Sequence, residues 1–400
     1  MHSTFWKKFS IAYNEGRLWP ALNSRLLPYR NGLKYIVFNP AAHTVTIHCP
    51  TLIEPNKREL PSVERIYRSF QKMKLAQEAT SDLYRPSSLW QEQLNDAYSF
   101  LISGAEGGDI KKFHLFLSNF GVWGTYTGVE ESTFIRRHAS LWWTRRYLQN
   151  DIFLNLLRLW KHYYNDRKSV QNLFRPNHGN LSGAYVDGVL VTVDSFFSEI
   201  YGSLLSGILQ SVKRPVIAEL GGGCGRLAYY TLRDMESFIY VDFDLPETLC
   251  LAAYSLMLAY PLKQFLLYGE EEYSPDLHEK YDFIFMPSCE IEKLKPSSID
   301  LFVNECSLGE MTQEAATNYV NCIAQSTRYF FHMNHDRFRN HYSGGRRSLL
   351  GWEYPVPEDQ FTLLFRYPEL KHMLFFNGST DFNSDTFIYL YERNARQNDC

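Results

Sequence analysis

The sequence has no cysteine pair at metal-binding or redox spacing, no long apolar run and no strong excess of charge. Its cysteines stand at positions 49, 224, 250, 289, 306, 322 and 400 and form no CxxC pair, so neither a metal site nor a disulfide framework is expected. No segment reaches the roughly 18 apolar residues of a membrane-spanning helix, and no apolar core follows residues 1–8 as it would in a signal peptide. We therefore expect a reduced, cytoplasmic protein.

The charge balance is close to even, with 41 basic and 44 acidic residues and a net charge of −3. This balance predicts no general attraction to nucleic acid or to anionic membranes. Aromatic residues are plentiful at 16% of the chain, and most of them are expected to pack in the core rather than to serve as platforms for sugar rings. The oligomeric state is left open by the composition, a homodimer included.

The most informative stretch is residues 216–226, Val-Ile-Ala-Glu-Leu-Gly-Gly-Gly-Cys-Gly-Arg. A short apolar run that ends in a glycine-dense turn predicts a buried parallel strand turning into a helix. A dinucleotide site requires G-x-G-x-x-G, but its third glycine would fall at Arg226. The pattern present is E-x-G-x-G-x-G, from Glu219 to Gly225, which resembles motif I of S-adenosylmethionine (SAM) methyltransferases.

A second carboxylate-bearing strand follows at residues 237–244. Asp244 lies 23 residues after Gly221, about where a carboxylate is expected to meet the hydroxyls of a ribose. The sequence Asp-Leu-Pro at 244–246 resembles the DLP turn of small-molecule O-methyltransferases. The two features together favour a methyltransferase over an unrelated α/β protein with a glycine turn.

The residues before the glycine turn predict three regions. Residues 1–60 form an extension in which the strand-like segments 35–38 and 44–48 are consistent with a small hairpin. Residues 61–175 are expected to form a helical domain, with helices starting near Val63, after Ser87 and near Leu141. The remaining region, 176–400, is the methyltransferase domain, which opens with a hairpin around Asp187-Gly188.

Further strands are expected at 281–287, 299–304, 329–335, near 363–365 and at 387–390. The third strand of the sheet is assigned to 281–287, and 265–268 is the second choice. Thr312 is expected to cap the helix that follows the fourth strand.

Several segments together resemble a family of predicted sugar O-methyltransferases from bacterial surface-polysaccharide gene clusters. The resemblance rests on Tyr-Arg-Pro-Ser-Ser-Leu-Trp at 84–90, on Val-Asp-Gly at 186–188, on 219–230, on Asp-Leu-Pro-Glu-Thr at 244–248 and on 300–311. It covers residues 80–390 and is densest over 216–311. Glu305 and Cys306 depart from the threonine- and histidine-like residues expected there from the family.

The resemblance implies a class I, Rossmann-like sheet of seven strands and SAM as the cofactor. No metal is expected, because the cysteines lack metal-ligand spacing. It also implies a sugar or glycan acceptor, either free or linked to a nucleotide or a lipid. The cofactor residues expected on this basis are Glu219, Gly221, Gly222, Gly223, Gly225, Arg226, Asp244, Leu245, Ser288, Cys289 and Asn304.

Methyl transfer to a hydroxyl requires a base near the acceptor oxygen. His335 is the first candidate because it follows the fifth strand, and Asp336 beside it is the expected orienting carboxylate. Glu310 is the alternative base. The stretch with Arg337, Arg339, Arg346 and Arg347 around Gly344-Gly345 is interpreted either as a lid that grips phosphates or as a solvated loop.

Two other functions stay open at this stage. A natural-product O-methyltransferase acting on aromatic or polyketide hydroxyls carries similar glycine and DLP segments. A binding protein with a degenerate methyltransferase fold is the second alternative, although an intact glycine turn together with Asp244 argues against it.

Overall fold

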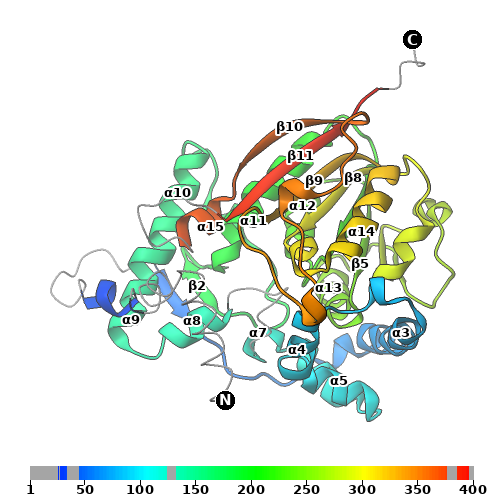
Figure 1. Cartoon of the computed structure of the whole chain (residues 1–400). Coiled ribbons are helices and arrows are strands. Elements are labelled where there is room, and N and C mark those ends of the chain that lie inside the picture. Colours follow the sequence, from blue (N-terminus) through cyan, green and yellow to red (C-terminus); the bar gives the residue numbers. More distant parts are fainter. Residues whose placement is uncertain (1–25, 27, 34–44, 124–131, 376–384, 396–400) are drawn as a thin grey trace.

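The computed structural model describes residues 26, 28–33, 45–123, 132–375 and 385–395. Within these residues, the largest element is a mixed sheet with the strand order β10-β11-β9-β8-β4-β5-β7-β6 (Figure 1). The strands are β4 (Val216–Leu220), β5 (Ile239–Asp244), β6 (Phe265–Leu267), β7 (Phe283–Pro287), β8 (Ile299–Glu305), β9 (Thr327–His335), β10 (Phe361–Pro368) and β11 (Thr386–Arg393).

Six adjacent strands of this sheet are mutually parallel, in the order β9, β8, β4, β5, β7 and β6. Strand β11 is antiparallel to both of its neighbours, β9 and β10. The Rossmann-like α/β fold predicted above is confirmed, with eight strands in the described sheet where seven were expected. The additional strand is β6. The first choice for the third strand was right, because β7 pairs with β5, while the alternative segment forms β6 on the outer edge of β7.

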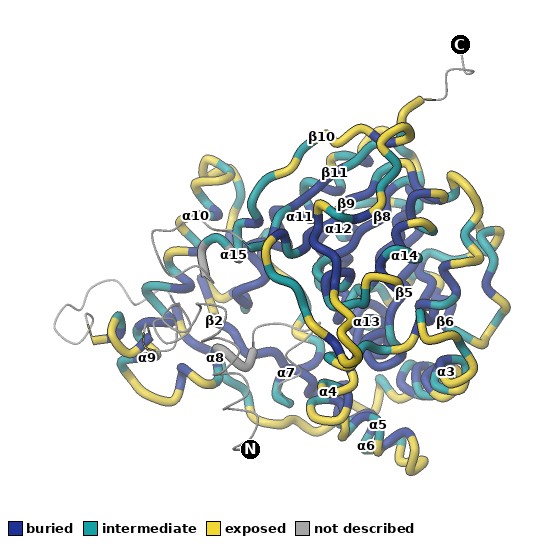
Figure 2. Tube along the Cα trace, in the orientation of Figure 1, coloured by how far each residue is buried: buried dark blue, intermediate teal, exposed yellow. Residues whose placement is uncertain are grey.

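Helices cover both faces of the sheet. They are α11 (Val193–Ile208), α12 (Arg226–Leu232), α13 (Pro246–Ala259), α14 (Gln313–Ser326) and α15 (Leu370–Phe375). Successive strand residues point to opposite faces, so Ile217 joins the core under α11, α12 and α13, whereas Ala218 joins the core under α14. The central strands are buried along most of their length (Figure 2). Thr312 caps α14 as predicted, accepting a hydrogen bond from the Ala315 amide.

The region before β4 is mostly helical, as expected, and α3, α4 and α5 lie side by side below the sheet in Figure 1. Its helices are α3 (Leu60–Ala79), α4 (Ser88–Asp96), α5 (Ser99–Glu106), α6 (Ile110–Leu117), α7 (Phe120–Trp123), α8 (Ser132–His138), α9 (Trp142–Tyr147), a π-helical segment (Leu148–Leu154) and α10 (Asn155–Tyr163). Val63, Ile66 and Phe70 form the buried stripe of α3. The Ser87 side chain caps α4.

A small antiparallel sheet joins the start of the chain to the middle. It consists of β1 (Val45–His48), β2 (Gly183–Val186) and β3 (Val189–Val191), in that order. The hairpin predicted around Asp187-Gly188 is confirmed, and both turn residues have positive φ, as a tight two-residue hairpin requires. The predicted strand at 44–48 is β1, but its expected partner at 35–38 lies outside the described residues.

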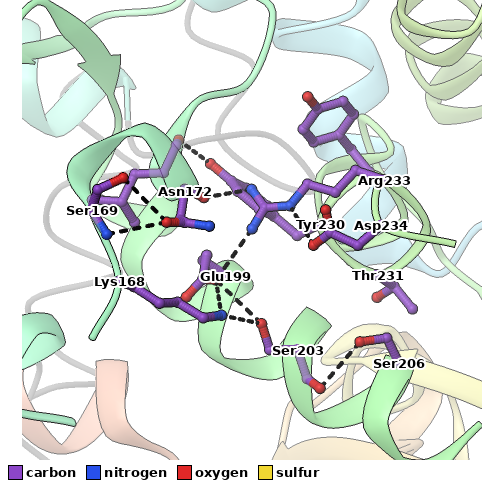
Figure 3. Close-up of polar contacts among 12 residues, drawn as sticks. Lys168, Ser169, Asn172, Glu199, Ser203, Ser206, Tyr230, Thr231, Arg233 and Asp234 are labelled. Carbon is purple, nitrogen blue, oxygen red and sulfur yellow. Dashed lines mark hydrogen bonds and ion pairs between the residues drawn. The ribbon is translucent and has the colours of Figure 1, made fainter. Parts of the chain in front are cut away.

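Contacts run across the expected domain boundaries, so the division at residues 60 and 175 stays a prediction. β1 pairs with β2, and α3 packs against α13. A buried polar network makes a further connection (Figure 3). The Glu199 carboxylate on α11 accepts hydrogen bonds from the Lys168 ammonium at 2.6 Å, the guanidinium of Arg233 at the C-terminal end of α12 at 3.2 Å and the Trp160 indole of α10 at 2.7 Å. The network therefore ties α10 and the segment before α11 to the first helix after the glycine turn.

Candidate active site

The glycine turn follows β4 and leads directly into α12. Gly221, Gly223 and Gly225 have φ values of 84°, 61° and 72°, a region that side chains rarely adopt. A Cβ atom at Gly221 would lie 2.4 Å from the Ser307 hydroxyl oxygen. The turn therefore needs glycine both for its backbone conformation and for its close approach to the end of β8.

Two carboxylates of β5 lie under this turn. The Gly223 amide donates to Asp244 Oδ2 at 3.1 Å, the Leu245 amide donates to Asp244 Oδ1 at 2.7 Å, and the Gly222 amide donates to Asp242 Oδ1 at 3.3 Å. Asp242 Oδ2 is buried and has no hydrogen-bond partner among the described residues. Burial raises the pKa of Asp244 to about 6 and raises the pKa of Asp242 well above its usual value.

A cavity of about 340 Å³ opens at this edge of the sheet, where the parallel strands end. Its volume falls in the range usual for small-molecule sites. The walls come from the glycine turn, the ends of β5, β7 and β8, the 3₁₀-helix Ser307–Glu310, the segment 82–90 and the residues Tyr342 and Arg346. We refer to this space below as the cavity.

The cavity brings together part of the predicted cofactor set: Gly221, Gly223, Asp244, Leu245 and Ser288. The other predicted residues do not line it within the described chain: Glu219, Gly222, Gly225, Arg226, Cys289 and Asn304. Three of them, Glu219, Arg226 and Asn304, make side-chain hydrogen bonds to the neighbouring strands or to residues of the cavity wall.

Glu219 and Arg226 contact residues of the sheet and of the cavity wall. The Glu219 carboxylate accepts from the Tyr240 hydroxyl at 2.6 Å, and burial raises the Glu219 pKa to about 7. The Arg226 guanidinium donates to Glu305 Oε1 at 2.8 Å and to the Ser198 hydroxyl at 2.7 Å. Because Glu305 lines the cavity, Arg226 acts on the cavity through Glu305.

Asn304 fastens the end of β8 to the glycine turn. Its amide donates to the Leu220 carbonyl at 2.9 Å, and its side-chain oxygen accepts from Asn334 of β9 at 2.8 Å. The Ser307 hydroxyl donates to the same Leu220 carbonyl at 2.9 Å. Between them, Cys306 adopts a φ of 65°, an uncommon value for a side-chain-bearing residue, and this kink starts the 3₁₀-helix that carries Glu310.

Glu310 lines the cavity from that 3₁₀-helix. Its carboxylate accepts a hydrogen bond of 2.8 Å from the indole Nε1 of Trp90, which lies 220 residues earlier on α4. Burial raises the pKa of Glu310 to about 7, while the Trp90 hydrogen bond and the nearby His335 act in the opposite direction. A carboxylate with this pKa can take up or release a proton near neutral pH.

His335 and Asp336 lie at the end of β9 but do not line the cavity in the described structure. The His335 ring Nδ1 lies 2.9 Å from Asp385 Oδ2, just before β11. Asp336 was expected to orient His335, and this was wrong: its Oδ2 accepts from Arg366 at 2.5 Å and from the Tyr389 hydroxyl at 2.7 Å. The carboxylate that contacts His335 is Asp385, which directly precedes Thr386, the β11 residue paired with His335 in the antiparallel register.

The arginine-rich stretch after β9 has mixed roles. Arg339 forms a two-pronged ion pair with Glu353 and so braces its own loop. Arg346 lines the cavity, next to Gly344 and Gly345, which both have a φ of 75°. The lid interpretation stays a prediction, now resting on Arg346 rather than on Arg339.

No family model and no curated protein matches the chain. Solved structures similar to it include magnesium protoporphyrin IX methyltransferase (ChlM) from Synechocystis PCC 6803 with bound SAM, at 13% identity over 49% of this chain and 79% of that chain, with a TM-score of 0.32. The methyltransferase domain of bacterial CtHen1 matches at 13% identity over 49% and 99%, with a TM-score of 0.33. Mitomycin 7-O-methyltransferase MmcR matches at 10% identity over 62% and 70%, with a TM-score of 0.30. Similarity at this level does not assign a function to the chain.

Among the described residues, no helix has both the length and the apolar character needed to cross a bilayer.

Proposed function

We propose that this chain is a SAM-dependent O-methyltransferase that transfers a methyl group to a hydroxyl of a sugar, in the synthesis of a surface glycan. The observation that carries the proposal is that the glycine turn and Asp244 open on the same cavity as Glu310. A cofactor site and a group able to accept a proton therefore share one space, as group transfer to a hydroxyl requires.

The residues at the turn fit SAM. Gly221 and Gly223 line the cavity, so the main chain of the turn is accessible there to the amino-acid part of the ligand. Asp244 already accepts two backbone amides and, as a carboxylate, has lone pairs left for ribose hydroxyls. Ser288 lies on the wall where the adenine would be expected.

The charge at the site also suits this cofactor. Glu219, Asp242, Asp244 and Glu310 all have raised pKa values, chiefly because they are buried. A ligand that carries a sulfonium and an ammonium would favour their ionised forms. When bound, SAM supplies a methyl group activated by the positive sulfur.

Glu310 is the base in this proposal. It lines the cavity, and its pKa of about 7 suits proton removal at neutral pH. His335, the first choice from the sequence, takes second place because Asp385 holds it outside the cavity lining. It lies close enough to Glu310 to influence its charge.

Support for a sugar acceptor comes from the segment 84–90, on which the family resemblance partly rests. Tyr84, Arg85, Ser87 and Trp90 from this segment line the cavity. Aromatic faces beside hydroxyl and guanidinium groups are suited to sugar rings and to their hydroxyls. The acceptor can be free or linked to a nucleotide or a lipid.

Two measurements test the proposal in order. Calorimetry with SAM and with S-adenosylhomocysteine should show binding to the purified chain, and absence of binding would reject the cofactor. Transfer of labelled methyl from SAM to a panel of sugars, sugar nucleotides and phenols should then favour a sugar. Preference for phenols would indicate a natural-product enzyme, and binding with no transfer to any acceptor would favour a binding protein.

A further inference from the structure

One side chain that lines the cavity, Trp90, comes from the helical region rather than from the sheet. Trp90 lies in the first turn of α4, and its own main-chain amide donates to the Ser87 hydroxyl that caps this turn. Its ring is only 9% exposed and packs against Tyr98, with 6.3 Å between ring centroids. The indole is therefore held rigidly, with its N–H directed at Glu310 Oε2 at 2.8 Å.

We propose that Trp90 is a positioning residue for Glu310: its indole N–H fixes the carboxylate in the cavity and favours the ionised form that accepts the proton. The inference rests on the proposed function, because it takes Glu310 as the base. It goes further by making the helical region a working part of the reaction site, in addition to a cover for the sheet.

The surroundings of Glu310 show why this hydrogen bond matters. The titratable groups that face Glu310 are His335, Asp244, Tyr98, Cys306 and Tyr342. Three further charged residues line the same cavity: Arg85, Glu305 and Arg346. Burial raises the pKa values of Tyr98, Cys306 and Tyr342, so these groups are neutral near pH 7 and cannot favour an anion by charge. Asp244 opposes ionisation of Glu310, and Trp90 and His335 favour it.

Removing the indole N–H should therefore raise the pKa of Glu310. Trp90→Phe keeps an aromatic ring in the same pocket but has no donor. A hydrogen bond to a charged group corresponds to a shift of about one to two pH units. The rise of turnover with pH should move to higher pH by that amount, with about tenfold or greater loss near pH 6.5 and recovery at high pH. A purely structural role would lower turnover equally at all pH values.

A second measurement does not depend on methyl transfer. Glu310→Gln is made both in the wild-type chain and in the Trp90→Phe chain. In each of the two backgrounds, the change in the free energy of unfolding caused by Glu310→Gln is measured in urea from pH 5 to 9. The pH at which this effect changes reports the ionisation of Glu310 in the folded protein. It should lie about one to two units higher when Trp90→Phe is present.

The matched control is Trp160→Phe, which removes another buried indole–carboxylate hydrogen bond, of 2.7 Å to Glu199, away from the cavity. It should destabilise the fold and leave both pH dependences in place. The inference is overturned if Trp90→Phe shifts neither the turnover profile nor the Glu310 ionisation. If the wild-type chain transfers no methyl group at all, the proposed function fails, and the unfolding measurement still decides whether Trp90 controls Glu310.

Discussion

Replacing Glu199 should strongly destabilise the protein, although Glu199 does not line the cavity. The Glu199 side chain is fully buried and accepts from both Lys168 and Arg233 (Figure 3). It also accepts from the Trp160 indole. Glu199→Ala would leave two cations without their shared carboxylate, and the Arg233 side chain is only 12% exposed. Breaking a buried pair by removing one partner costs about 3–5 kcal/mol, because the remaining charge stays buried.

Asp234 supplies a matched control on the same guanidinium. It contacts Arg233 Nε at 3.3 Å, but its own side chain is 74% exposed. An exposed ion pair contributes roughly 0–1 kcal/mol, so Asp234→Ala should change the stability little.

The assay is urea unfolding at pH 7, followed by circular dichroism, with SAM calorimetry on the folded variants. Glu199→Gln should fall between wild type and Glu199→Ala, because it keeps the side-chain volume and an acceptor for the indole. The reasoning is refuted if Glu199→Ala costs no more than Asp234→Ala, since the network would then be no stronger than a surface contact.

Four further outcomes are expected. Asp244→Ala should weaken SAM binding by roughly 1.5–3 kcal/mol in calorimetry, as for other hydrogen bonds to a charged group; an unchanged affinity would rule out the ribose contact. Glu310→Gln should lower turnover by about 10²-fold or more with SAM affinity retained, while His335→Asn keeps most of the turnover; the opposite result would restore His335 as the base. In the wild type, turnover should be lost as the pH falls through about 7, where Glu310 takes up a proton. His332→Phe should reduce the loss of stability at acid pH. Burial lowers the pKa of His332 in the folded protein to about 3, so below about pH 6.5 the unfolded chain binds a proton that the folded chain does not. The free energy of unfolding of the wild type should therefore fall by about 1.4 kcal/mol for each pH unit below that value. Parallel curves for the two proteins would contradict this.

The sheet and the glycine turn were predictable because their signals are local. Most central strands are short, largely apolar runs with a clear end: β4 is followed by a glycine, β5 and β8 end in a carboxylate, and β7 ends in a proline. The turn at Asp187-Gly188 was equally clear, because few residues other than asparagine, aspartate and glycine accept positive φ. In such places the neighbours along the chain decide the structure.

The contacts of the candidate bases were not predictable in this way. Asp385 reaches His335 only because β11 pairs with β9 in one register, with Thr386 opposite His335. Asp336 was the nearer carboxylate in the sequence, but it turns to Arg366 and Tyr389 on the opposite face of the sheet edge. Sequence proximity was a poor guide here because adjacent residues of a strand face opposite ways.

Trp90 shows the same limit over a longer separation. The capped helix that carries it was predicted from Ser87, but its indole contact with Glu310 depends on how α4 docks against the end of β8. The segment 84–90 did contain a signal, since it contributed to the family resemblance. The resemblance indicated that the segment has a role in the protein, but it did not show that Trp90 contacts Glu310.

The strand order has a consequence for how the chain folds as it is synthesised. β10 is made before β11, yet it reaches the sheet only through β11, which lies between β10 and β9. While the ribosome adds residues 369–393, roughly a few seconds at ordinary synthesis rates, the outer edge of β9 has no strand beside it and β10 has no partner in the sheet. Such an open edge can pair with another chain, so a stalled or truncated product that lacks β11 should aggregate. This should happen even though that product already contains the glycine turn, Trp90 and Glu310.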